Sequence, residues 1–101
     1  MAITVFIRYE VEPHLIHEFE AYARCWLEIV PRCGGELVGY WLPHEGRNFE
    51  AYGLVSFANL AAYEDYRARL RTDEAGAANF HFAREGRFIR IEERTFLRRL
   101  E

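Results

Sequence analysis

Three segments of this chain alternate along the sequence like β-strands, yet they carry large apolar side chains on both of their faces. In residues 2–10, Tyr9 points one way and Phe6 points the other. Residues 36–42 and 49–57 repeat this arrangement, with aromatic residues at both odd and even positions. Apolar residues on both sides of a strand predict burial on both sides. A sheet with one bare face does not fit this pattern.

Helices are predicted between these strands. Apolar residues recur at helical spacing from Pro13, which suits the first turn of a helix, and the pattern stops at Pro31 and a Gly-Gly pair shortly after it. Asn59 is a suitable N-cap for a second helix, which we expect to fray near Thr72. The segment after Thr72 contains alanines but also Gly76, so it predicts only a short, irregular helical piece.

The order of the elements points to one fold. The residues PHEGRN, between the second and third strands, are turn formers and predict a hairpin. A last strand, residues 87–96, alternates again, with Ile89 and Ile91 on one face. The order β-α-β-β-α-β is that of the α+β ferredoxin-like fold, a four-stranded antiparallel sheet with both helices on one face. Because the helices cover only that face, we expect an identical chain to cover the other in a homodimer.

Length and charge limit the partners. With 101 residues, 50% of them hydrophobic, residues 1–101 predict a single domain with one core. The net charge of -3 is not the basic excess that binds nucleic acid or an acidic membrane surface, so neither is expected as a partner. The N-terminus lacks the features of a signal peptide, and no apolar run approaches the ~20 residues of a membrane span. We expect a cytoplasmic protein.

Several runs of the sequence together resemble one family. Besides Tyr9 and Pro13, they are GGELVGYWLPHEG, AYGLVSFANLAAYEDYRARL and FIRIEERTFL. The combination is similar to the bacterial branch of the NIPSNAP family over almost the whole chain. The resemblance implies a dimeric α+β barrel, in which two ferredoxin-like units pack their sheets face to face. Relatives in that superfamily include cofactor-free and haem-degrading monooxygenases, but the NIPSNAP family supplies no catalytic residue set, so the resemblance implies a fold and an assembly more than a reaction.

Aromatic side chains of the strands are the first candidates for a binding site. Tyr9, Trp41 and Tyr52 occupy sheet positions where they could line an apolar pocket with polar tips, or else form the core or the dimer interface. Tyr40 belongs to the same group. His81 lies between two phenylalanines and could ligate a haem or face outward while its neighbours pack. The ligand-binding candidates are Tyr9, Trp41, Tyr52 and His81.

His44 and Glu45 stand side by side in PHEGRN. They could form a proton relay or supply one metal ligand, but adjacent turn residues seldom point at one atom, so a solvated hairpin connection is favoured. His14 and His17 share one side of the first helix, and two ligands do not make a metal site. The sequence supports no glycine-rich phosphate loop, catalytic triad or carboxylate pair. We therefore expect neither a metal nor a cofactor.

The arginines of the first and last strands are expected to form ion pairs within the sheet. Arg8 could pair with Glu10 or meet an anionic ligand, and pairing is favoured. Likewise, Arg90 could pair with Glu92 or meet an anionic ligand, and pairing is favoured.

Two cysteines fall on the first predicted helix. Cys25 and Cys33 are roughly 12 Å apart along it at about 1.5 Å per residue, too far for the Cα separation of about 4.4 to 6.8 Å in a disulfide. We expect both to be reduced, buried thiols.

These patterns predict a NIPSNAP-like homodimer that binds a small apolar or aromatic molecule. The alternative is a cofactor-free monooxygenase-like enzyme, in which Trp41, Tyr52 or His81 orients an aromatic substrate or moves a proton. Haem-linked chemistry is a third possibility, and it requires His81 or His44 to face a cavity.

Overall fold

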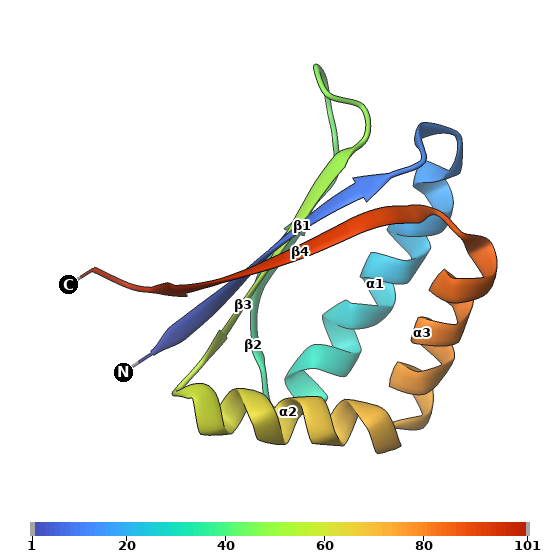
Figure 1. The fold of residues 1–101 in the computed structure, drawn as a ribbon. Helices are drawn as coiled ribbons and strands as arrows, with labels where there is room; N and C mark the ends of the chain where they lie inside the picture. Colours follow the sequence, from blue (N-terminus) through green and yellow to red (C-terminus); the bar gives the residue numbers. More distant parts are fainter. Residues whose placement is uncertain (1, 101) are drawn as a thin grey trace.

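An antiparallel sheet covered on one face by helices forms the structure (Figure 1). The computed structural model describes residues 2–100. Its elements are β1 (Ile3–Val11), the 3₁₀ turn η1 (Pro13–Leu15), α1 (Ile16–Arg32), β2 (Glu36–Trp41), β3 (Glu50–Phe57), α2 (Leu60–Thr72), α3 (Glu74–Gly86) and β4 (Ile89–Arg98). The strand order is β2-β3-β1-β4, and every neighbouring pair is antiparallel. This confirms the predicted α+β ferredoxin-like fold.

The end of α1 is set by glycine rather than by proline. Pro31, expected to stop the helix, lies inside its last turn. The backbone N–H of Gly34 donates to the carbonyl of Pro31, and that of Gly35 donates to the carbonyl of Val30. Gly34 has a φ of +106°, which a residue with a side chain rarely adopts. This paired arrangement is a Schellman motif, and it turns the chain directly into β2.

The segment after α2 is a regular helix, which corrects the prediction of a short, irregular piece. Asn59 caps α2 as expected, because its Oδ1 accepts from the N–H of Ala62. Asp73 directly follows α2 and caps α3 through the N–H of Gly76. A Cβ on Gly76 would lie 3.2 Å from the carbonyl oxygen of Leu70, so glycine lets α3 start close against the end of α2. No helix within residues 2–100 is long and apolar enough to cross a membrane.

A bulge in β2 changes which of its residues face the helices. The register against β3 shifts after Leu37, so Val38 is an extra residue. Leu37 lies opposite Val55, which is buried under the helices. Tyr40 lies opposite Gly53 on the same face. Strict alternation puts Leu37 and Tyr40 on opposite faces, and this expectation was wrong because the extra residue reverses the alternation.

A second bulge, in β4, has the same effect. Ile89 lies opposite Val11 on the helix-covered face. Ile91 lies opposite Glu10 on the other face and is 45% exposed. The prediction that Ile89 and Ile91 share a face was wrong, because Arg90 is an extra residue between them.

The core fills the layer between the sheet and the helices. Phe19 of α1 meets Tyr9 of β1 edge to face, with ring centres 4.9 Å apart. Trp26 of α1 packs on Phe80 of α3 at the same distance. Fully burying one such ring contributes about 1.5–3 kcal/mol to the free energy of folding. Because α1 buries Phe19, Trp26 and four further residues, it contributes a large share of the core. The buried apolar residues are Val5, Ile7, Tyr9, Val11, Phe19, Tyr22, Ala23, Trp26, Ile29, Val30, Cys33, Ala51, Val55, Phe57, Tyr66, Leu70 and Phe88.

Candidate functional site

Four tyrosine side chains meet between the sheet and the helices. Tyr9 comes from β1, Tyr40 from β2, Tyr22 from α1 and Tyr66 from α2. Together with Trp26 they line an interior cavity of about 20 Å³. A cavity of this size with polar groups in its wall can hold a water molecule. The interior is therefore apolar in bulk but polar at one point.

A missing side chain on β3 makes room for this cluster. A Cβ on Gly53 would lie 2.8 Å from Cε1 of Tyr40, so only glycine lets the Tyr40 ring lie across β3. In this position the Tyr40 hydroxyl is 3.1 Å from that of Tyr9. The glycine and the β2 bulge together position the pair.

Burial keeps these hydroxyl groups neutral. It raises the pKa of Tyr9, Tyr22 and Tyr40 well above the ordinary value for tyrosine. Burial also raises the pKa of Tyr66, to about 12, against the opposing positive charges of Arg67 and Arg94. Neutral hydroxyls can both donate and accept hydrogen bonds, so the cluster can bind a polar group of either kind.

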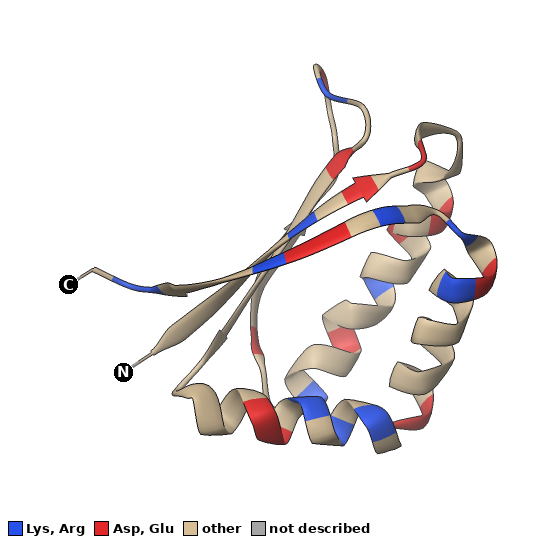
Figure 2. Cartoon of the chain, in the orientation of Figure 1, with Lys and Arg blue, Asp and Glu red and all other residues tan. Residues whose placement is uncertain are grey.

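Two arginines border the same cavity, one on α2 and one on β4. Arg94 lies 2.6 Å from the carboxylate of Glu92, two residues along β4, and Figure 2 shows basic and acidic residues in succession along this strand. Arg67 is half-buried on α2, and among residues 2–100 it makes no ion pair. The charges of Arg67, Arg94 and Glu92 therefore sum to +1 at the edge of the tyrosine-lined cavity.

A second interior cavity, also of about 20 Å³, adjoins the first toward the start of α2. Tyr63 and Phe57 line only this second cavity. Tyr66, Arg67 and Arg94 line both cavities. The arginines therefore border the whole interior space, and the side chain of Arg94, 32% exposed, also reaches the protein surface.

A wider groove, of about 360 Å³, lies between α1 and α3 on the outer surface. Its lining is mostly small or apolar, and it is open to solvent. Its buried polar residue, Asn79, already donates to the backbone carbonyl of Tyr22. The groove thus offers less to a polar ligand than the interior does.

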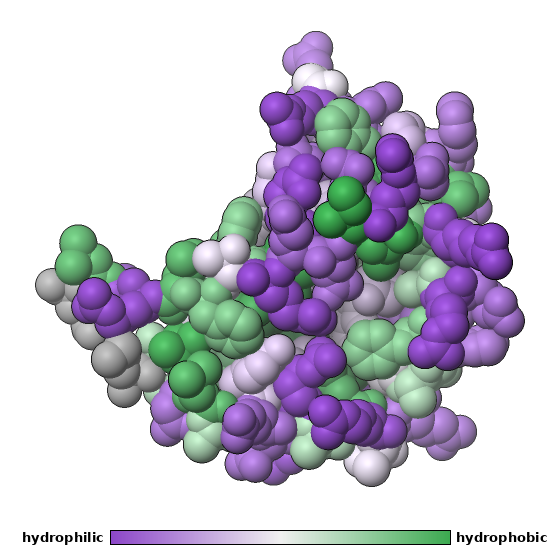
Figure 3. Space-filling view, viewed as in Figure 1, coloured by the Kyte–Doolittle hydropathy of each residue, from purple (hydrophilic) through white to green (hydrophobic). Residues whose placement is uncertain are grey.

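The helix-free face of the sheet carries a second aromatic group. Phe6 and Tyr52 stack with ring centres 5.5 Å apart, and Trp41 is 47% exposed. Apolar side chains also gather at the end of β4 and the start of α2 (Figure 3), where Phe96 packs on Tyr63 on the helix-covered side. The apolar residues of the helix-free face are Phe6, Trp41, Tyr52, Leu54, Ile91 and Leu97.

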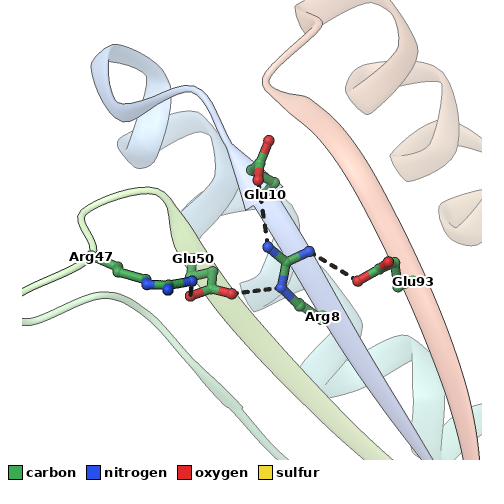
Figure 4. A network of polar contacts seen from close by, with 5 residues as sticks. All are labelled: Arg8, Glu10, Arg47, Glu50 and Glu93. Atoms are coloured by element: carbon green, nitrogen blue, oxygen red, sulfur yellow. Dashed lines mark hydrogen bonds and ion pairs between the residues drawn. The ribbon is translucent and has the colours of Figure 1, made fainter.

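One end of the helix-free face is charged (Figure 4). Arg8 stands at the centre, and its guanidinium donates to Glu50, Glu10 and Glu93. Arg47, from the loop between β2 and β3, donates to the second carboxylate oxygen of Glu50. The network joins three strands of the sheet to this loop.

The pKa of Glu50 is lowered, chiefly by its hydrogen bond to Arg8. Glu50 is therefore ionised at neutral pH although it is 9% exposed. The expected pair between Arg8 and Glu10 is present, at 3.4 Å. The expected pair between Arg90 and Glu92 was wrong. Arg90 lies 3.5 Å from Glu12 instead, because the bulge turns Glu92 toward the helices.

Comparison with known proteins places the chain in a family. The NIPSNAP family model matches residues 4–101. The chain belongs to the NIPSNAP family. No match was found among curated proteins.

Solved structures share the NIPSNAP fold of this chain. A NIPSNAP family protein of unknown function from Agrobacterium tumefaciens is 23% identical, with 95% of this chain and 86% of that chain covered and a TM-score of 0.81. An uncharacterised NIPSNAP-like domain protein from Burkholderia xenovorans is 19% identical, with coverages of 98% and 85% and a TM-score of 0.80. SnoaB, a cofactor-independent oxygenase from Streptomyces nogalater, is 14% identical, with coverages of 99% and 94% and a TM-score of 0.60. At these identities the similarity is one of fold.

The four predicted site residues of this NIPSNAP chain lie in three places. Tyr9 lines the interior cavity. Trp41 and Tyr52 lie on the helix-free face, opposite each other in the register of β2 and β3. His81 lies on the outside of α3 with 67% of its side chain exposed, 3.8 Å from Glu85. The structure therefore brings Trp41 and Tyr52 together and separates them from the other two.

The other histidines are at the surface. His44 is exposed in the loop between β2 and β3, which agrees with the predicted hairpin connection. His14 and His17 are exposed at the start of the helical layer. Within residues 2–100, no three His, Cys, Asp or Glu side chains are grouped to hold a metal ion.

The two cysteines differ. Cys33 is buried at the end of α1, as predicted. Cys25 is exposed, so the prediction of a buried thiol was wrong for it.

Sequence reasoning missed four residues of the interior site: Tyr22, Tyr66, Arg67 and Arg94. The helical spacing of Tyr22 and Trp26 could have indicated the first of them. Arg94 faces the helices only because of the β4 bulge, and nothing in the sequence of that strand indicates the bulge.

Proposed function

We propose that this NIPSNAP chain acts as a homodimer and that each subunit binds a small aromatic or apolar molecule between its sheet and its helices. The cluster of four tyrosines around the interior cavity, three of them buried and Tyr40 half-buried, carries the proposal. Ligand pockets commonly combine apolar walls with a few polar groups at fixed positions. The interior of this chain has that composition, with the Tyr9 and Tyr40 hydroxyls 3.1 Å apart.

The helix-free face supports the homodimer. Trp41 is 47%, Ile91 45% and Leu97 44% exposed, all on one side of the sheet. An apolar surface of this extent is stabilised by burial, and a second copy of the same face is a self-complementary partner. The Arg8 network at the end of the face would lie at the polar edge of such an interface.

Two tryptophans allow binding in the interior to be measured. Trp26 lines the interior cavity, whereas Trp41 lies on the helix-free face. In a heteronuclear NMR titration with para-tert-butylbenzamide, an uncharged aromatic probe, we expect the indole N–H signal of Trp26 to shift and that of Trp41 to stay. The signals are assigned with Trp41→Phe. If neither signal moves up to the solubility limit with this probe or with its carboxylate analogue para-tert-butylbenzoate, the proposal is wrong. If only the Trp41 signal moves, binding takes place on the other face.

Light scattering tests the dimer. We expect twice the mass of one chain for the wild type and a monomer for Phe6→Glu, which puts a charge at the centre of the helix-free face. Leu60→Glu is the matched control, because Leu60 is an exposed leucine on α2 rather than on the sheet. A wild-type monomer at micromolar concentration would overturn the dimer.

The alternative function is that of a cofactor-free monooxygenase. It requires a group that orients the substrate or moves a proton, and the three residues put forward for this role do not line the interior cavity. The fold similarity to SnoaB favours no residue of this chain for that role. Small-molecule binding is therefore the function that the geometry supports best.

A further inference from the structure

We infer that the interior cavity takes an aromatic molecule that ends in a single carboxylate, and that Arg67 and Arg94 hold this carboxylate. The inference rests on the proposed function, because it names the ligand class for the same site. It starts from the two arginines that border the cavities, of which Arg67 makes no ion pair within residues 2–100 and Arg94 pairs with Glu92.

The guanidinium of Arg67 has N–H donors that no acidic side chain within residues 2–100 uses. It is half-buried, it lines both interior cavities, and among residues 2–100 no acidic side chain pairs with it. Other arginines that make no ion pair within residues 2–100, such as Arg71 and Arg84, are exposed, whereas Arg67 is half-buried. A guanidinium carries five N–H donors in a planar fork that fits a carboxylate with two parallel hydrogen bonds. The unpaired fork at the edge of the interior is thus suited to a planar anion.

The local charge fixes how much negative charge the ligand can carry. Arg67 and Arg94 contribute two positive charges and Glu92 contributes one negative charge, so the sum is +1. One carboxylate neutralises this sum, whereas an uncharged ligand leaves it unbalanced at a partly desolvated site. Tyr66 lines both cavities together with the two arginines, so its hydroxyl can donate to the same group.

The positions of the two arginine side chains also determine how much space the interior has for the aromatic ring of the ligand. Each cavity alone, at about 20 Å³, is too small for an aromatic ring. Because Arg67 and Arg94 border both cavities, a shift of these side chains toward solvent joins the cavities along Ile7 and Val55, which line both. A carboxylate at the rim would hold the guanidinium groups there, while the ring fills the space among the tyrosines.

A pair of probes of nearly equal shape tests the inference. Para-tert-butylbenzoate and para-tert-butylbenzamide differ in charge but hardly in size, and the Trp26 indole signal and calorimetry measure the affinity of the full-length protein for each. We expect the carboxylate to bind about tenfold or more tightly than the amide, which is the effect of a charge-assisted hydrogen bond. We also expect this preference to weaken as salt is added.

Charge-changing variants locate the effect. Arg67→Gln and Arg94→Gln should each remove most of the preference for the carboxylate while the amide still binds. Glu92→Gln should strengthen carboxylate binding, a gain that a purely structural role of Glu92 does not produce. Arg71→Gln, on an exposed position of α2, is the matched control and should change nothing.

The outcomes separate the two proposals. Equal affinity for carboxylate and amide, or a preference that survives Arg67→Gln and Arg94→Gln, overturns the inference and leaves the proposed function standing. Binding of neither probe overturns both. Weaker carboxylate binding by Glu92→Gln also contradicts the inference, because the sign of the charge effect is then wrong.

Discussion

Gly53 shows how one residue determines the interior of this protein. Without a side chain on Gly53, the Tyr40 ring lies across β3 and reaches Tyr9. Gly53 itself has no left-handed backbone conformation, so its role is to leave space for the ring. The site is therefore sensitive to a change at a residue that lines neither interior cavity.

Gly53→Ala should destabilise the protein by about 1–3 kcal/mol, the usual cost of inserting a methyl group into a packed interior. The added Cβ, 2.8 Å from the Tyr40 ring, must push the ring away from Tyr9. Chemical denaturation measures the change. We also expect the Trp26 indole signal to move in the unliganded variant.

Gly39→Ala is the matched control, in the neighbouring strand. There the new Cβ meets the Trp41 ring at 3.1 Å, but that ring is 47% exposed and can move away. If both variants lose the same stability, crowding against Tyr40 is not the cause.

At the scale of the elements, Asp73 holds the helical layer together. It ends α2, caps α3 through Gly76 and pairs with Arg32 of α1. These contacts lower the pKa of Asp73, with the Arg32 hydrogen bond as the largest cause. One residue thus connects three helices, through its carboxylate to α1 and α3 and through its backbone N–H to the carbonyl of Arg69 in α2.

Asp73→Ala should lower the midpoint of thermal unfolding by a few degrees at neutral pH, because an N-cap and an ion pair are lost. Since the pKa is lowered in the folded state, the carboxylate stabilises the fold above its unfolded pKa of about 4, and this contribution disappears as the pH falls further. Circular dichroism should therefore show the difference between wild type and Asp73→Ala shrinking in acid. A difference that stays constant down to the acid limit would contradict this account.

The elements could be predicted from the sequence where a local signal decides them. The alternation of β1 and the Asn59 cap are such signals, and both are confirmed. The bulges at Val38 and Arg90 could not be predicted, because a bulge depends on how two strands pair. The regular helix α3 was missed because Gly76 is unfavourable by helix propensity, while its contact with the end of α2 favours glycine.

At the scale of the whole molecule, the sheet separates two chemically different regions. The helix-covered side holds tyrosine hydroxyls and two arginines, and the helix-free side holds stacked aromatic residues beside the Arg8 network. The candidate site could be predicted from the sequence only in part. Tyr9 follows from simple alternation, but the positions of Tyr40 and Arg94 depend on bulges, and Arg67 could be recognised only once α2 was placed against β4.

If the helix-free face joins two copies, stability should depend on protein concentration. The midpoint of thermal unfolding should rise with concentration for the wild type, because association favours the folded state by mass action. Phe6→Glu should unfold at a lower temperature that does not change on dilution. A wild-type midpoint that is independent of concentration over a wide range would speak against the dimer.

Helices α2 and α3 meet directly at Asp73, so a rotation of α2 relative to α3 would have its pivot at this residue. The rise of a helix is about 1.5 Å per residue, so Arg67 lies about 9 Å and Leu60 about 20 Å from Asp73 along α2. A swing of about 10° displaces Arg67 by about 1.6 Å and Leu60 by about 3.4 Å on that geometry. Such a swing would therefore displace the start of α2, where Tyr63 packs on Phe96, about twice as far as Arg67.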